Sequence, residues 1–174
     1  MLSKGQVPPN IDSTSIGGRR VDLNALRGRK VLVKFHRFSG CPVAQNQIHD
    51  LINGQARLNE AGIETIVLLH STKDKIDPIY KEVPGLHIIP DRQKTFYRRF
   101  DSPFSWRALM SPASNAITSR SILKGYVPLF GRFQGGVIAY PSDFLINEKG
   151  VIAALHYGKH FGDTWTVSDV LAMA

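Results

Sequence analysis

Apolar and amphipathic stretches alternate along the first hundred residues of the chain. The runs VLVKF (31–35), IETIVLL (63–69) and LHIIPD (86–91) are short and rich in β-branched residues, which is typical of buried strands. Between the first two runs, apolar residues recur with helical spacing from Pro42 to Gly62, where the glycine can cap the helix. Segments 71–83 and 92–100 predict two further short helices.

A hairpin pattern follows later in the chain. In SDFLINEKGVIAALHYG (142–158) two apolar runs flank NEKG, in which Gly150 supplies a left-handed turn position. The last segment, TVSDVLAMA (166–174), predicts a closing helix. Early strand–helix–strand crossovers imply parallel pairing and the hairpin is antiparallel, so we expect an α/β fold with a central mixed β-sheet flanked by helices.

The domain organisation follows from length and from two irregular stretches. A chain of 174 residues suggests one domain. Residues 1–20, rich in proline, glycine and serine, are expected to form a loose N-terminal lead-in, and residues 21–174 a single domain. An irregular insert at about 101–134 precedes the hairpin; a connection of this length is functional or contains a helix that the pattern does not place.

Composition narrows the class of protein. No apolar run reaches the roughly 20 residues that cross a bilayer, and the first residues lack the apolar core of a secretory signal, so a cytoplasmic protein is expected. The formal net charge is +8, but the basic residues are dispersed, which favours a solvated surface over a nucleic-acid site. His156 and His160 lie four residues apart without a third ligand nearby, so we expect no metal site.

The single cysteine, Cys41, stands between a predicted strand and a predicted helix. Pro42 suits the first helical turn, which places Cys41 at or near the N-cap. The unpaired N–H groups and the helix dipole there favour the thiolate over the thiol, and Arg37 can add a positive charge. A thiolate in that position is a nucleophile toward a peroxide or a disulfide. The alternative is a free cysteine that is buried as a small hydrophobic residue.

Three segments resemble one known family. VKFHRFSGCPVAQNQI (33–48) is similar to the active-site segment of thioredoxin-fold proteins, and AYPSDFLINEKGVIAALHYGKHFGDTW (139–165) and FDSPFSWRALMSP (100–112) match later parts of the same pattern. The resemblance is closest to the peroxiredoxin-like branch of the alkyl hydroperoxide reductase C and thiol-specific antioxidant family, and it extends from Val21 to the end. It implies a thioredoxin-like fold.

The resemblance also implies a set of site residues. Cys41 and Arg37 would be catalytic, and five residues would shape the site or contact substrate: Ser39, Gly40, Pro42, Tyr140 and Pro141. Pro141 matches the place where thioredoxin-like folds have a cis-proline against the redox cysteine. The alternative is an ordinary trans proline at the start of a strand.

The chain departs from the family pattern at three positions. Ala44 replaces the second cysteine of the Cys-x-x-Cys motif, Phe38 stands where peroxiredoxins have Thr or Ser, and Pro141 stands where they have an arginine. A local disulfide therefore cannot form, and an oxidised Cys41 would need an external thiol to restore it. Arg37 is the residue that could replace the missing arginine.

The function expected from the sequence is a thiol-dependent antioxidant oxidoreductase. Cys41 would reduce hydroperoxides without a cofactor, and an external thiol such as glutathione or a thioredoxin would be the reductant. The alternatives are monothiol exchange on a disulfide substrate, a non-catalytic thioredoxin-fold protein that binds a partner or senses redox state, and a basic nucleic-acid-associated protein. The resemblance leaves a homodimer open, and no membrane partner is expected.

Overall fold

The computed structural model describes residues 1–105, 110–129 and 139–174. The chain alternates strands and helices up to residue 100 and ends in a hairpin and a helix, as the apolar pattern predicts. The elements in chain order are β1 (Asp12–Thr14), β2 (Arg20–Asp22), the 3-10 helix η1 (Leu23–Leu26), β3 (Lys30–His36), α1 (Pro42–Glu60), β4 (Ile63–Leu69), α2 (Lys73–Ile76), β5 (Leu86–Pro90), α3 (Thr95–Arg99), α5 (Pro112–Leu123), β6 (Ser142–Ile146), β7 (Ile152–Tyr157) and α6 (Val167–Met173).

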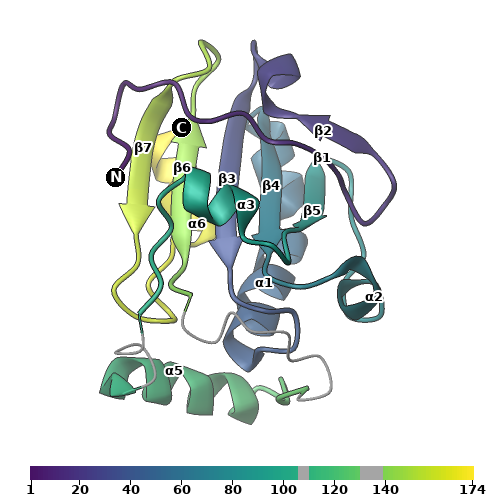
Figure 1. The fold of residues 1–174 in the computed structure, drawn as a ribbon, viewed down its shortest axis with the longest axis vertical. Helices are drawn as coiled ribbons and strands as arrows, with labels where there is room; N and C mark the ends of the chain where they lie inside the picture. Colours follow the sequence, from purple (N-terminus) through teal and green to yellow (C-terminus); the bar gives the residue numbers. More distant parts are fainter. Residues whose placement is uncertain (106–109, 130–138) are drawn as a thin grey trace.

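Five strands form the central sheet in the order β5-β4-β3-β6-β7 (Figure 1). Strands β3, β4 and β5 are parallel, whereas β6 is antiparallel to β3 and β7 is antiparallel to β6. The predicted mixed sheet is therefore confirmed. Gly150, in the turn between β6 and β7, has the positive φ of 77° that its place in the hairpin requires. Because β3 is the central strand, the loop after His36 leaves the middle of the sheet at its carboxyl edge.

Helices cover both faces of this sheet. In Figure 1, α1 and α6 lie behind it, whereas α3 and the N-terminal segment cross in front. We call these the α1 face and the α3 face. Each face has its own buried apolar cluster, with Leu32 and Leu145 in the cluster of the α1 face and Phe35 and Phe144 in that of the α3 face. Helix α5 lies beyond the carboxyl end of β3 (Figure 1).

Side chains alternate between the two faces along β3. Val33 and Phe35 belong to the cluster of the α3 face, and Leu32 to that of the α1 face. Lys34 and His36 share the parity of Leu32, so they also point to the α1 face, where both are buried. The strand that precedes the cysteine therefore presents polar side chains to the helix that the cysteine begins.

Two regions contain elements that the apolar pattern does not place. The segment expected to be a loose lead-in contains β1, which pairs with β2. The neighbouring Ile11 is fully buried, because its side chain joins the cluster of the α3 face. Its carbonyl accepts a hydrogen bond from Leu23 N–H. The insert contains α5, whose N-cap Ser111 accepts a hydrogen bond from Ser114 N–H. Two parts of the insert, 106–109 and 130–134, lie outside the described residues. The domain boundary after residue 20 stays a prediction.

Within the described ranges, no helix combines the length and the apolar character that crossing a membrane requires.

Candidate functional site

Cys41 is the N-cap residue of α1, as the sequence predicts. Its backbone is extended, with φ −75° and ψ 125°, and its carbonyl accepts the first helical hydrogen bond from Gln45 N–H at 2.9 Å. Pro42 occupies the first turn, and no acidic side chain stands there to oppose a negative charge on sulfur. Since Cys41 is only 1% exposed, its thiol lies inside the cluster of the α1 face.

Arg37 lies directly against the sulfur. Its Nη1 donates to Cys41 Sγ at 2.9 Å, and its guanidinium carbon lies 3.5 Å from the centroid of the Phe161 ring. The side chain is buried, and this burial lowers the pKa of the Arg37 guanidinium, while its contact with Cys41 opposes that shift. A guanidinium remains protonated in such a place, so the structure brings a desolvated cation to the thiol.

Ser39 holds the loop between Arg37 and Cys41 in place. Its N–H donates to Ser71 Oγ at 3.0 Å, its Oγ donates to the Lys75 carbonyl at 3.0 Å, and its carbonyl accepts from Tyr80 Oη at 3.0 Å. Burial raises the pKa of Tyr80, which keeps that hydroxyl a donor. The Ser39 hydroxyl is thus occupied by α2 and shapes the loop rather than the space around sulfur.

Gly40 links the thiol loop to the segment after α5. Its carbonyl accepts from Leu129 N–H at 3.1 Å and from Gln45 Nε2 at 3.2 Å. The same Gln45 amide donates to the Val127 carbonyl at 2.9 Å. These bonds hold residues 127–129 over the first turn of α1, which contributes to the burial of Cys41.

Tyr140 and Pro141 reach the site less directly than expected. Tyr140 packs on the apolar cluster that contains Cys41, and its ring centroid lies 6.4 Å from that of Phe161. The expectation of a cis-proline is wrong, because the described residues contain no cis peptide bond. Pro141 is instead the trans proline before β6, buried, with its carbonyl accepting from Gly158 N–H at 2.9 Å.

Three side chains that sequence reasoning did not assign to the site belong to it. The ring of Phe161 covers Arg37, and its carbonyl accepts from Gln47 Nε2 at 3.1 Å. Gln47 Oε1 lies 3.1 Å from His36 Nδ1. Burial, with help from nearby Lys34, lowers the pKa of His36 to about 4, so this imidazole is neutral at pH 7. The available signal was the parity of His36 with Lys34 and Leu32 on a strand.

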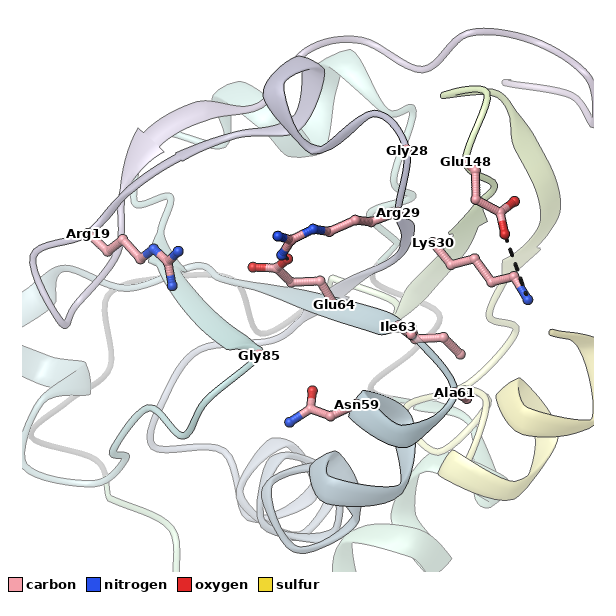
Figure 2. Close-up of a pocket in the computed structure, with 11 residues that line it drawn as sticks. Arg19, Gly28, Arg29, Lys30, Asn59, Ala61, Ile63, Glu64, Gly85 and Glu148 are labelled. Atoms are coloured by element: carbon pink, nitrogen blue, oxygen red, sulfur yellow. Dashed lines mark hydrogen bonds and ion pairs between the residues drawn. The ribbon is translucent and has the colours of Figure 1, made fainter.

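One pocket of the structure lies far from this thiol. Figure 2 shows it at the opposite edge of the sheet, where β3 and β4 begin. Its volume is about 530 Å³. Its charges are mostly paired, since Arg29 lies 2.9 Å from Glu64 and Lys30 lies 4.0 Å from Glu148. In the described parts of the chain, no group of three or more His, Cys, Asp or Glu side chains forms a potential metal site.

Comparison with solved structures shows the same fold in peroxiredoxins. A mutant of peroxiredoxin 6 from Arenicola marina matches with a TM-score of 0.67 and 13% identity, over 98% of this chain and 71% of that one. Reduced 2-Cys peroxiredoxin from Plasmodium vivax gives 0.67 and 15%, over 98% and 93%. The thiol peroxidase from Chromobacterium violaceum gives 0.64 and 11%, over 99% and 86%.

A search of curated protein sequences found no significant match. The profile of the AhpC/TSA family, in contrast, matches residues 5–155, which is most of the chain and includes Cys41, Arg37 and most of the late hairpin. With the mixed sheet and the cysteine at the start of α1, this match shows that the chain belongs to the AhpC/TSA family.

Proposed function

We propose that the protein is a single-cysteine peroxidase in which the Cys41 thiolate reduces hydroperoxides. The observation that carries the proposal is the contact between Arg37 Nη1 and Cys41 Sγ at 2.9 Å, at the N-terminus of a 19-residue helix. The guanidinium and the helix dipole both stabilise negative charge on sulfur. A guanidinium beside the sulfur would also polarise a peroxide oxygen that approaches the thiolate, and in this way Arg37 would replace the arginine for which Pro141 stands in the family pattern.

The reaction balances with one thiol and an external reductant. The Cys41 thiolate attacks one peroxide oxygen, the O–O bond breaks, and the leaving alkoxide or hydroxide takes up a proton to give an alcohol or water. Cys41 is then a sulfenic acid, oxidised by two electrons. A first external thiol displaces water to form a mixed disulfide, and a second releases Cys41 and leaves as the disulfide. The chain has one cysteine, so both thiols must come from outside.

Burial favours a small peroxide over a disulfide substrate. Cys41 is 1% exposed and Arg37 is 7% exposed, so the sulfur has little open surface around it. Disulfide exchange needs the attacking sulfur to meet a bulky S–S group, whereas hydrogen peroxide is little larger than water. We therefore expect hydrogen peroxide to react faster than cumene hydroperoxide, and protein disulfides to react slowest.

Peroxide consumption with dithiothreitol as reductant tests the proposal. We expect turnover in the wild type, none above background in Cys41→Ser, and a rate reduced roughly tenfold or more in Arg37→Lys, the scale of one charge-assisted hydrogen bond. Arg29→Lys is the matched control, because Arg29 pairs with Glu64 at the far edge of the sheet. Equal consumption by the wild type and Cys41→Ser would sink the peroxidase and favour a non-catalytic scaffold that keeps its thiol for packing.

A further inference from the structure

A continuous set of contacts joins the α1 face of β3 to the sulfur. His36 lies against Gln47, Gln47 against the Phe161 carbonyl, and the Phe161 ring against Arg37. Arg37 in turn donates to Cys41. The distances are 3.1 Å from His36 Nδ1 to Gln47 Oε1 and 3.1 Å from Gln47 Nε2 to the Phe161 carbonyl. The Arg37 guanidinium carbon lies 3.5 Å from the centroid of the Phe161 ring, and Nη1 lies 2.9 Å from the sulfur. Residues from β3, α1 and the loop after β7 thus form a series of contacts that ends at one cation.

The donor of each contact follows from the chemistry of the groups. The Phe161 carbonyl can only accept, so the Gln47 amide turns its nitrogen toward it. Gln47 Oε1 then faces His36 and accepts, which assigns the imidazole hydrogen to Nδ1. Among the described residues, the buried Nε2 of His36 has no hydrogen-bond partner, so Gln47 is the polar contact that fixes this ring.

We propose that Gln47 is a positioning residue that holds the Phe161 ring over Arg37, with His36 setting the direction of the Gln47 amide. The consequence for turnover rests on the peroxidase function proposed above. The Phe161 ring takes the place of the water that would contact this side of an exposed guanidinium. A ring over a desolvated cation is worth more than the same contact in water, so it fixes the guanidinium where its Nη1 meets the sulfur.

Phe161 needs such a tether because it lies in an irregular loop after β7. Besides its bond to Gln47, its N–H donates to Ser114 Oγ of α5 at 3.2 Å. The following turn is held separately, through Asp163, which accepts from His156 Nε2 and from Lys159 N–H, each at 2.7 Å. Loss of the Gln47 bond therefore loosens the Phe161 ring without releasing the whole loop.

Charged groups near this tether come from three elements. Lys34 of β3 and Asp143 of β6 act on His36 in opposite directions. Lys34 and Asp50 of α1 line, together with Gln47, a pocket of about 360 Å³ beside the loop. Arg37 is the cation that the tether serves. A neutral substitution at Gln47 keeps all of these charges in place, which makes the sulfur's titration a clean readout.

The test is the thiolate titration of Cys41, followed by ultraviolet absorbance, in Gln47→Met. We expect its midpoint to rise by roughly one pH unit relative to wild type, because a loosened guanidinium stabilises the thiolate less. Gln55→Met is the matched control: Gln55 is a buried glutamine of the same helix, and its amide donates to the carbonyls of Ile63 and Gly85, far from the thiol. Its midpoint should equal that of wild type.

A second pair of variants guards against misfolding of Gln47→Met. Phe161→Leu removes the ring and should raise the midpoint by a similar amount, whereas Phe161→Tyr keeps the ring and should not. In addition, His36→Asn should shift the midpoint in the same direction, and His36→Asn with Gln47→Met should shift it no further than Gln47→Met alone. Additive shifts would indicate two independent structural losses.

The outcomes separate this proposal from the peroxidase. An unchanged midpoint in both Gln47→Met and Phe161→Leu would overturn the positioning role, whatever the turnover. A raised midpoint in a protein that does not consume peroxide would support the positioning role and reject the peroxidase. The thiolate titration is carried out without peroxide, so it tests the positioning role independently of peroxide consumption.

Discussion

The two faces of the central sheet are both buried, but they are built differently. The α3 face is packed with aromatic rings. The centroid of the Phe35 ring lies 5.0 Å from that of Tyr97 and 5.1 Å from that of Phe100, and the Phe100 and Phe144 centroids are 5.1 Å apart. The α1 face mixes its apolar cluster with the buried polar side chains Lys34, His36 and Asp143. The α3 face is packed mainly through aromatic rings, whereas the α1 face also buries charged and polar groups that need partners inside the protein.

The buried ion pair shows what this mixture requires. Lys34 Nζ lies 2.7 Å from Asp143 Oδ1, with the two side chains 3% and 0% exposed. Asp143 also accepts from Trp165 N–H and from the Thr164 hydroxyl, which ties the loop after β7 to the sheet. Lys34 and Asp143 thus neutralise each other's charge inside the protein. The loop that contacts Asp143 also contains Phe161. The polar side chains Lys34 and Asp143 therefore form a hydrogen-bonded group with Thr164 and Trp165 within the otherwise apolar α1 face.

The largest expected effect comes from breaking that pair. Lys34→Met leaves Asp143 buried without its cation, and we expect the free energy of unfolding to fall by about 3–5 kcal/mol. Urea denaturation measures it. Lys30→Met is the control, since Lys30 pairs with a half-exposed Glu148 at 4.0 Å and should cost less than about 1 kcal/mol. A loss as small in Lys34→Met would mean that Asp143 is satisfied by its hydrogen bonds alone.

The next effect is a pH dependence from His36. The pKa of His36 is about 4 in the folded protein, whereas its ordinary value, which we take for the unfolded chain, is 6.5. As the pH falls, the unfolded chain therefore takes up the proton before the folded protein does. Stability from this group is complete above pH 6.5 and is lost as the pH falls toward 4, by about 3 kcal/mol in all. Denaturation of wild type against His36→Asn, from pH 7 downward, isolates this contribution. Parallel curves for the two proteins would refute it.

The smallest effect tests the aromatic face. Phe35→Leu removes one ring from the cluster that includes Tyr97 and Phe100, and we expect it to cost about 2 kcal/mol of unfolding free energy. Phe35 points away from α1, so the thiolate titration of Cys41 should not move. A shifted titration midpoint in this variant would show that the two faces are coupled through the backbone of β3.

Local signals predicted most of the fold and the position of Cys41 at the start of α1. The apolar run 63–69 coincides with β4, and Pro42 marks the first residue of α1. Cys41 and Arg37 are close in sequence, so the start of one helix brings them together. Phe161 is different, because its place over Arg37 depends on how a loop that is distant in the sequence folds back onto the start of α1. Helix α5 was not placed because its sequence has no apolar stripe, and β1 because a short pair with β2 leaves little pattern.

The burial of Cys41 makes the protein its own reporter of opening. A single thiol that is 1% exposed cannot meet a bulky maleimide until the first turn of α1 or the segment at 127–129 moves away. The labelling rate of the native protein therefore counts openings at one defined point, without a foreign dye or a second cysteine to remove. Peroxide is small, so it would reach the sulfur through smaller and more frequent openings than a maleimide. The reaction rates of the two reagents would therefore report two different opening motions around Cys41.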